Sequence, residues 1–383
     1  MVERPPLFYI QYFMKNYTYL LFCLLIGQLA IGQNIKATLM DSETNLPIQQ
    51  IAVISDDESF FGVTNDKGEV ILPENLINQT VFVDDYLYMY EEKTLKSSED
   101  FVWELQPNSE TLEELLIYKN PKPVLQEVID NSIKSFSTDA GLETYFSSKG
   151  SVATYSHFST DAIVNVYMKP DNVVDIAVVQ CRAKEELNEE EKNSISLSSR
   201  LAHPSNFSQV LYFEQIKEML DQIKHYEISI TSKKVGESTI HTCYFYPKEK
   251  SKKKMMIAGY FSYNADKKLI LEVKYDTPEE KVKYNKMNVL IASVRDVTVS
   301  SHIKYAVTEN HYYPTYSQYA GKALVRAKIA KIDTKMDFVN EFFILSDQPR
   351  PISQNQLLNE NPIDIGDRYT EKFWTDPRIQ NHE

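Results

Sequence analysis

The sequence has little glycine, little cysteine and no excess of basic residues, and each shortage argues against a class of protein. Only 10 of the 383 residues are glycine, and neither Gly-x-Gly-x-x-Gly nor Gly-x-x-x-x-Gly-Lys occurs, so no phosphate-cradling loop is indicated. The net charge of −13 argues against a nucleic-acid partner, which would require a basic face. Tyrosine is abundant by contrast, at 25 residues, and this balance favours long strands with aromatic faces.

Motifs for metal binding and catalysis are also missing. There is no His-Glu-x-x-His for zinc and no Gly-x-Ser-x-Gly around a nucleophilic serine. His241 and Cys243 could ligate a metal from one strand face, but no third or fourth ligand can be identified, so core or surface roles are the better interpretation. We therefore expect no catalytic residue, no metal and no cofactor, and we favour a protein that is not an enzyme. A catalytic site formed by residues from distant segments would not be detected by a search for sequence motifs.

Residues 1–32 are typical of a secretory signal peptide. Lys15 precedes an apolar run over 17–26, and small residues lead to a predicted cleavage between Gly32 and Gln33. The alternative is a membrane anchor, but the run falls short of the roughly 20 apolar residues that span a bilayer. No later stretch is long and apolar enough for a transmembrane helix. The sequence therefore predicts export to the periplasm or outer membrane.

Removal of the signal peptide leaves two cysteines, Cys181 and Cys243. An oxidising compartment permits them to form a disulfide. Two separate buried thiols, each acting as a small apolar side chain, are an equal alternative.

Short apolar runs bounded by turn residues over 35–105 predict a compact β-module. Within it, residues 61–70 read Phe-Gly-Val-Thr-Asn-Asp-Lys-Gly-Glu-Val, and residues 44–48 read Thr-Asn-Leu-Pro-Ile. Both segments resemble carboxypeptidase-regulatory-like domains, which are prealbumin-like β-sandwiches of Gram-negative cell-envelope proteins. The resemblance implies a seven-stranded sandwich over 33–106 that serves as a scaffold or adhesion unit and has no catalytic residues. Residues 84–86 depart from it, because they read Asp-Asp-Tyr where the family usually has Gly-Tyr.

The rest of the chain predicts a linker over 107–122, a larger antiparallel α+β domain over 123–346 and an extended tail over 347–383. The linker segment 112–118 is expected to be a strand that packs on its own chain or docks on a partner. Apolar spacing predicts helices over 123–136 and 207–224, and repeated period-two alternation predicts a sheet with one buried face. Phe373 and Trp374 are expected to anchor the tail. The fold class is therefore mainly β, or α+β, with few helices.

Three charged or aromatic segments have a functional and a structural interpretation. The acidic run 185–191 and the lysine run 248–254 could bind a cation and anionic headgroups respectively, although solvated loops are the more ordinary outcome. The densest aromatic patch could form a ligand or partner surface, although packing on the sheet is favoured, and it comprises Tyr312, Tyr313, Tyr316 and Tyr319.

Together these features predict a non-enzymatic exported protein that binds an envelope protein or a lipid. One alternative is a lipid or lipoprotein carrier, with a curved antiparallel sheet and a helix over its mouth. A hollow beneath helix 207–224 would favour the carrier, whereas a solid core there would favour the interaction protein. The residues expected to line such a hollow are Leu269, Tyr275, Ile303 and Tyr305. A second alternative is a hydrolase, which would require convergent His, Asp and Ser side chains in a cleft.

Overall fold

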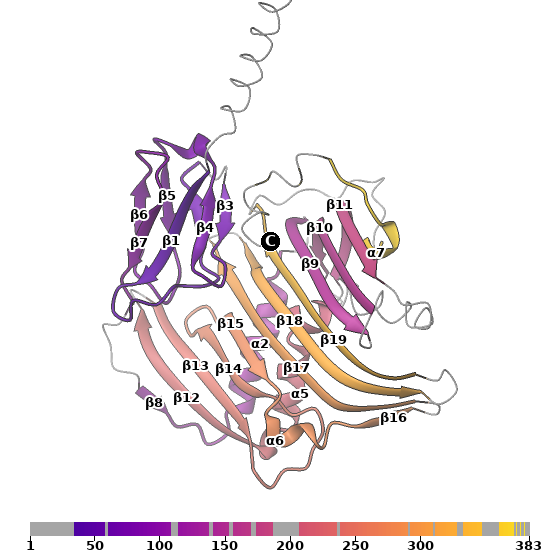
Figure 1. Cartoon of the computed structure of the whole chain (residues 1–383). Helices are drawn as coiled ribbons and strands as arrows, with labels where there is room; N and C mark the ends of the chain where they lie inside the picture. The colour runs from indigo at the N-terminus through magenta and orange to yellow at the C-terminus, as the bar shows by residue number, and fades with distance from the viewer. Residues whose placement is uncertain are drawn as a thin grey trace, which may run out of the picture.

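A computed structural model describes most of the chain after the predicted signal peptide (Figure 1). The described residues are 34–57, 60–108, 114–137, 141–152, 156–169, 174–186, 207–235, 238–289, 292–308, 311–327, 332–346 and 360–370, with 373, 376 and 379. The predicted signal peptide and its cleavage position at Gly32 and Gln33 lie outside them, as does Trp374.

The N-terminal module is a sandwich of seven strands in two sheets, as the fold class predicted. One sheet has the order β4-β1-β7 and the other β3-β2-β5-β6. Alternate residues of the two sheets face a common apolar core that includes Leu39, Val53 and Trp103. The strands are β1 (Ile35–Asp41), β2 (Ala52–Ser55), β3 (Phe61–Val63), β4 (Glu69–Leu72), β5 (Thr80–Val83), β6 (Glu91–Thr94) and β7 (Phe101–Leu105).

The turn before β4 is closed by Gly68, which has a φ of 72°. A left-handed backbone is disfavoured for residues with a Cβ. A Cβ at this position would also lie 2.7 Å from the carbonyl oxygen of Leu39. Glycine is therefore required here both for the backbone conformation and for the close approach of β1.

The larger domain is one antiparallel sheet of twelve strands, with the order β11-β10-β9-β19-β18-β17-β15-β14-β13-β12-β8 and β16 paired to β17. The long strands β17 to β19 bend along their length (Figure 1). The strands are β8 (Glu114–Leu116), β9 (Leu142–Val152), β10 (Ser156–Met168), β11 (Val174–Glu186), β12 (Tyr226–Val235), β13 (Ser238–Pro247), β14 (Ala258–Asn264), β15 (Leu269–Asp276), β16 (Met287–Val289), β17 (Ala292–Val307), β18 (Tyr312–Ala327) and β19 (Ile332–Ile344).

Short helices cover one face of this sheet, which we call the inner face (Figure 1). Helix α2 (Lys122–Ser135) matches the predicted helix over 123–136. The single helix predicted over 207–224 is instead broken into α4 (Phe207–Leu211) and α5 (Glu214–Asp221). The break is at Phe213, whose φ of 60° is left-handed and interrupts the helical backbone. The apolar spacing was correct, because Val210, Ile216 and Leu220 all face the core.

The sandwich packs against the opposite, outer face of the sheet. Phe61 and Val63 of the sandwich join one apolar cluster with Tyr313 and Phe343 of the sheet. Phe373 of the tail belongs to the same cluster and is 1% exposed, which confirms its predicted role as an anchor. Helix α7 (Pro362–Ile365) precedes it and packs on β11.

The remaining helical segments are α6 (Glu279–Val282), between β15 and β16, and two 3-10 turns, η2 (Glu74–Leu76) and η5 (Ile223–His225). In the described part of the chain, no helix combines the length and the apolar character needed to cross a membrane.

Candidate functional site

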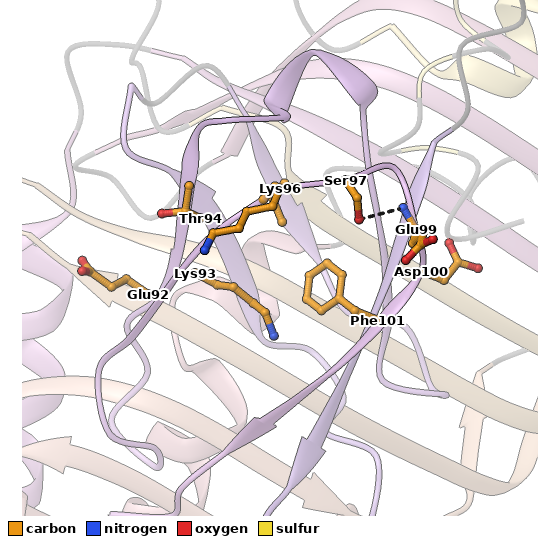
Figure 2. Close-up of a pocket in the computed structure, with 9 residues that line it drawn as sticks. Glu92, Lys93, Thr94, Lys96, Ser97, Glu99, Asp100 and Phe101 are labelled. Carbon is orange, nitrogen blue, oxygen red and sulfur yellow. Dashed lines mark hydrogen bonds between the residues drawn. The ribbon is translucent and has the colours of Figure 1, made fainter.

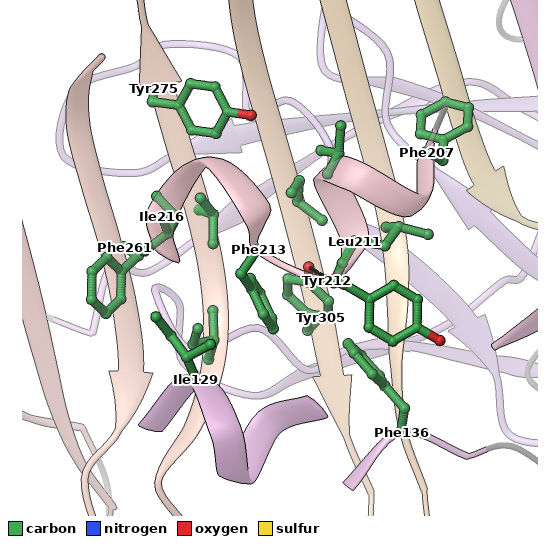
Figure 3. Close-up of a cluster of buried hydrophobic side chains, with 14 of the residues drawn as sticks. Ile129, Phe136, Phe207, Leu211, Tyr212, Phe213, Ile216, Phe261, Tyr275 and Tyr305 are labelled. Atoms are coloured by element: carbon green, nitrogen blue, oxygen red, sulfur yellow. Dashed lines mark hydrogen bonds between the residues drawn. The ribbon is translucent and has the colours of Figure 1, made fainter. Parts of the chain in front are cut away.

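The inner face of the sheet is the first candidate, because helices cover it. Leu269, Tyr275, Ile303 and Tyr305 are all less than 10% exposed and belong to the same core cluster as α2, α4 and α5. These four side chains are buried in the cluster that the helices cover, and Figure 3 shows Tyr275 and Tyr305 within it. The finding favours the interaction protein over the carrier by the criterion set from the sequence.

Aromatic rings form the centre of this layer. Phe136, at the end of α2, stacks on Tyr312 with ring centroids 5.1 Å apart, and Tyr305 stacks on Tyr312 at 5.4 Å. Phe213, at the break between α4 and α5, packs on Tyr305 at 5.4 Å. Such pairs contribute about 0.5–1.5 kcal/mol each beyond their buried area. Ring contacts thus help to hold the helical cover to the sheet, and Figure 3 shows Phe136, Phe213 and Tyr305 close together.

A few hydrogen bonds supplement these ring contacts. The Tyr305 hydroxyl donates to the Leu211 carbonyl at 3.3 Å, and the Tyr312 hydroxyl donates to the Ile270 carbonyl at 2.8 Å. The Ile270 N–H donates to Ser132 Oγ of α2 at 3.0 Å. These bonds satisfy polar groups that the helices remove from water.

The four tyrosines of the predicted aromatic patch are divided between the two faces of the sheet. Tyr312 lies in the inner layer and Tyr319 packs against it, whereas Tyr313 and Tyr316 lie in the outer cluster against the sandwich. The Tyr316 hydroxyl accepts from Gln50 Nε2 at 2.7 Å and donates to Glu341 at 2.9 Å. These contacts agree with the role that the sequence analysis favoured, in which the tyrosines pack on the sheet. A ligand or partner surface at these residues stays a prediction that would require the helices or the sandwich to move.

The outer face carries a second candidate, a buried polar cluster between the two domains. Glu272 of β15 is 3% exposed. It accepts a hydrogen bond from the Tyr86 hydroxyl of the sandwich, and its Oε1 lies 2.6 Å from His302 Nε2 of β17. Close by, Lys304 Nζ pairs with Asp85 of the sandwich at 3.4 Å. The cluster therefore connects the sandwich to the sheet through charged and hydrogen-bonded groups.

The electrostatics of this cluster keep Glu272 ionised. Burial alone raises the pKa of the carboxyl, but the hydrogen bond with His302 and the charge of Lys304 outweigh burial and bring the pKa down to about 2. An efficient general base has a pKa near the operating pH. With both oxygens engaged and so low a pKa, Glu272 suits a structural connection better than proton transfer.

A hollow of about 460 Å³ lies beside this cluster, where the sandwich meets β14, β15, β17 and β18. Its walls carry both signs of charge, which suits a polar ligand rather than an acyl chain. Its polar lining includes Gln49, Gln50, Asp66, Tyr88, Tyr260, Glu272, Lys274, His302, Lys304 and Gln318.

A second hollow, of about 510 Å³, lies wholly within the sandwich between β6 and β7 (Figure 2). The Lys93 ammonium lies 4.5 Å from the centre of the Phe101 ring, a cation–π contact. Most of the remaining lining is polar and exposed, including Glu92, Ser97, Glu99 and Asp100, and Leu95 is the buried apolar exception. This arrangement indicates a surface groove rather than an enclosed binding site.

The predicted linker strand is β8, at one edge of the large sheet. It pairs with β12 of its own chain, with Leu116 opposite Ile230, which confirms the expectation that the segment packs on its own chain. Its other edge pairs with no strand of the described chain. Leu115 is 64% exposed and the adjoining Ile117 is 91% exposed. An edge strand with exposed apolar side chains is a template for pairing with another chain.

Of the two alternatives that the sequence left open for the cysteines, the structure has the two separate buried thiols and not the disulfide. Cys181 on β11 and Cys243 on β13 are both buried free thiols. Eight strand positions separate β11 from β13 in the sheet, at about 4.8 Å each, whereas a disulfide requires Cα atoms within about 7 Å. Burial raises the pKa of the Cys243 thiol to about 12, so it acts as a small apolar side chain.

The remaining predicted segments lie as follows. His241 Nδ1 is 3.1 Å from the Tyr263 hydroxyl. Lysines of the run 248–254 are exposed between β13 and β14. Only residues 185 and 186 of the acidic run belong to the described chain, at the end of β11.

Sequence reasoning missed the cluster around Glu272. The alternation along β15 and β17 does place Glu272, His302 and Lys304 on one face of the sheet. Nothing in the sequence shows that β15 pairs with β17 or that Tyr86 docks there, because both contacts join segments far apart in the chain.

No family model and no curated protein matches the chain, so the resemblance to carboxypeptidase-regulatory-like domains stays a prediction. A LolA superfamily protein from Nitrosomonas europaea is 8% identical with a TM-score of 0.21, over 59% of this chain and 94% of that chain. Lipovitellin, in a structure of its lipid–protein interactions, is 7% identical with a TM-score of 0.26, over 62% of this chain and 28% of that chain. A DUF1329 family protein from Desulfovibrio piger is 10% identical with a TM-score of 0.18, over 58% and 93%. At scores this low the likenesses carry no argument about the ligand.

Proposed function

We propose that this chain is a non-enzymatic, exported binding protein of the cell envelope, and that its sandwich and large sheet form one scaffold. The edge strand β8 is the observation that carries the proposal. Its outer edge is unpaired within the described chain, and Leu115 and Ile117 present apolar surface to solvent beside it. An extended segment of an envelope protein fits this edge, because main-chain hydrogen bonds would provide affinity and the two apolar side chains would provide contact area.

Lysine substitutions at this edge test the proposal. A photo-reactive side chain at residue 114 is expected to cross-link one specific envelope protein in cells. Leu115→Lys with Ile117→Lys should abolish that adduct, since charge on an edge strand opposes pairing. Val102→Lys is a matched control, because Val102 is 58% exposed on the sandwich. Equal cross-linking in the wild type, the double variant and the control would refute β8 as the binding edge.

A second candidate function is binding of acyl chains on the inner face, beneath its helical cover. The inner face of the sheet is mostly apolar, and its cover consists of short helices with a left-handed break at Phe213. Because the layer is packed at Leu269, Tyr275, Ile303 and Tyr305, a ligand would enter only if α4 and α5 moved away from the sheet. The hydrolase alternative lacks such support, because Glu272 beside the interdomain hollow is held at low pKa by its partners.

A further inference from the structure

We propose that the inner face carries a hydrogen-bonding site for the carbonyl group of an acyl ester or amide, formed by the hydroxyls of Tyr275, Ser301 and Ser317. The inference rests on the second candidate function, binding of acyl chains, and names the head group that the layer would accept.

The register of the sheet brings these three residues together. Tyr275 of β15 lies directly opposite Ser301 of β17. Ser317 of β18 lies opposite Ile303 and is the diagonal neighbour of Ser301 across the next pair of strands. Residues two apart on a strand share a face, so all three hydroxyls belong to the inner face. Figure 3 shows the Tyr275 hydroxyl directed away from its own strand.

All three side chains are deeply buried and lack partners. Tyr275 is 2% exposed, Ser301 is 4% exposed and Ser317 is 0% exposed. No described group forms a hydrogen bond of ordinary geometry with any of their hydroxyl oxygens. Burial raises the pKa of Tyr275, and the Ser301 hydroxyl, which lies close enough to interact with the Tyr275 hydroxyl, offsets part of the rise. Buried polar groups are nearly always paired, so three orphans on adjacent strands point to an external partner.

The chemistry of the site selects a neutral acceptor. Two of these hydroxyls can donate to the two lone pairs of one carbonyl oxygen, and the apolar layer around them suits a hydrocarbon chain. A charged head group is disfavoured, because Glu218 of α5 lies near enough to raise the pKa of Tyr275 further and would repel an anion. Both a free lipid and a lipid-modified protein contain an acyl ester, so either could supply this group.

Two probes with the same number of non-hydrogen atoms test the inference. Methyl dodecanoate carries an ester carbonyl and pentadecane carries none, and the affinity of the full chain for each is measured by displacement of a fluorescent apolar dye. A variant that combines Tyr275→Phe, Ser301→Ala and Ser317→Ala should bind methyl dodecanoate about tenfold or more weakly than the wild type, because the hydrogen bonds to the ester are lost. Pentadecane should bind the wild type and the variant equally.

A matched control changes the same residue types on the outer face, with Tyr244→Phe, Ser262→Ala and Ser300→Ala. This control should bind both probes as the wild type does. The thermal unfolding midpoint of the ligand-free inner-face variant should also stay unchanged or rise, because the hydroxyls it lacks have no partner to lose.

The outcomes separate the two levels of the proposal. If the wild type binds both probes and the inner-face variant loses nothing, acyl-chain binding stands and the carbonyl site is refuted. The same conclusion follows if the ligand-free variant is markedly destabilised, because the hydroxyls would then hold a buried water only. If the wild type binds neither probe, acyl-chain binding itself fails.

The source of the ester is identified by competition. A diacylglycerol and a synthetic diacylated peptide each compete with methyl dodecanoate for the wild type. Stronger competition by the diacylated peptide indicates a lipoprotein cargo, and stronger competition by the diacylglycerol indicates a free lipid. Competition by neither refutes the inference.

Discussion

Replacement of Glu272 by glutamine is the most informative change at the junction of the two domains. The substitution keeps the shape of the side chain and removes its charge, so it mimics the protonated carboxyl. The pKa of Glu272 falls from 4.5 to about 2 in the folded protein. A difference of about 2.5 units, at roughly 1.4 kcal/mol per unit, corresponds to about 3 kcal/mol of stability. Glu272 is 3% exposed, so solvent does little to screen this contribution.

The direction of the pH dependence follows from the lowered pKa. Because the folded protein holds the carboxylate more strongly than the unfolded chain does, the stabilisation is fully present above a pH of about 4.5 and is lost as the pH falls toward about 2. We therefore expect Glu272→Gln to unfold at lower urea concentration than the wild type near neutral pH. The gap should close at a pH of about 2, where the wild type also loses the charge.

Glu227→Gln is the control, because Glu227 is exposed on β12 and loses no buried contact on substitution. It should follow the wild type at both pH values. The reasoning is refuted if Glu272→Gln matches the wild type near neutral pH, or if the gap persists unchanged at low pH. Since Tyr86 belongs to the sandwich and Glu272 to the sheet, the substitution should mainly weaken the contact between the two domains.

Two further substitutions test single contacts of the fold. Lys281 is 1% exposed, and its Nζ donates to the carbonyls of residues 248, 249 and 251 at 2.8, 3.1 and 3.0 Å, so Lys281→Met should cost about 3 kcal/mol in urea unfolding. Lys283→Met, at an exposed position, should cost little, and an equal effect of the two would contradict the role of the buried ammonium. Gly68→Ala should destabilise the protein more than Gly366→Ala. Both have φ near 70°, but an added Cβ clashes with backbone only at Gly68; equal midpoints would show that the clash is relieved at no cost.

Local patterns predicted the elements of this fold well. The turn at Gly68, the sandwich strands, helix α2 and the alternation along β12 to β18 all depend on residues close together in the sequence. The apolar stripe over 207–224 identified the buried face, but it could not show the break at Phe213. Phenylalanine has no preference for a left-handed backbone, so tertiary packing must impose that conformation.

Long-range pairings account for what the sequence could not show. From the sequence alone, a disulfide between Cys181 and Cys243 and two separate thiols were equal alternatives. Only the strand order of the sheet shows that the two cysteines lie far apart. The tyrosines near residue 312 looked like one patch in the sequence. A strand places successive side chains on opposite faces, and an irregularity in the pairing of β17 with β18, between Lys304 and Tyr305, shifts that alternation in a way that the sequence does not show. The contact of Tyr86 with Glu272 and the shared face of Ser301 and Ser317 depend on the same register.

The central claim is that this chain holds a ligand and does not convert one. Native mass spectrometry of the protein isolated from its own cell envelope, without detergent stripping or denaturation, tests it most directly. The account predicts a stoichiometric adduct, which would be a protein partner released by Leu115→Lys with Ile117→Lys or an acyl lipid that organic solvent extracts. A bare polypeptide mass, together with turnover of an ester or peptide substrate by the same preparation, would contradict it.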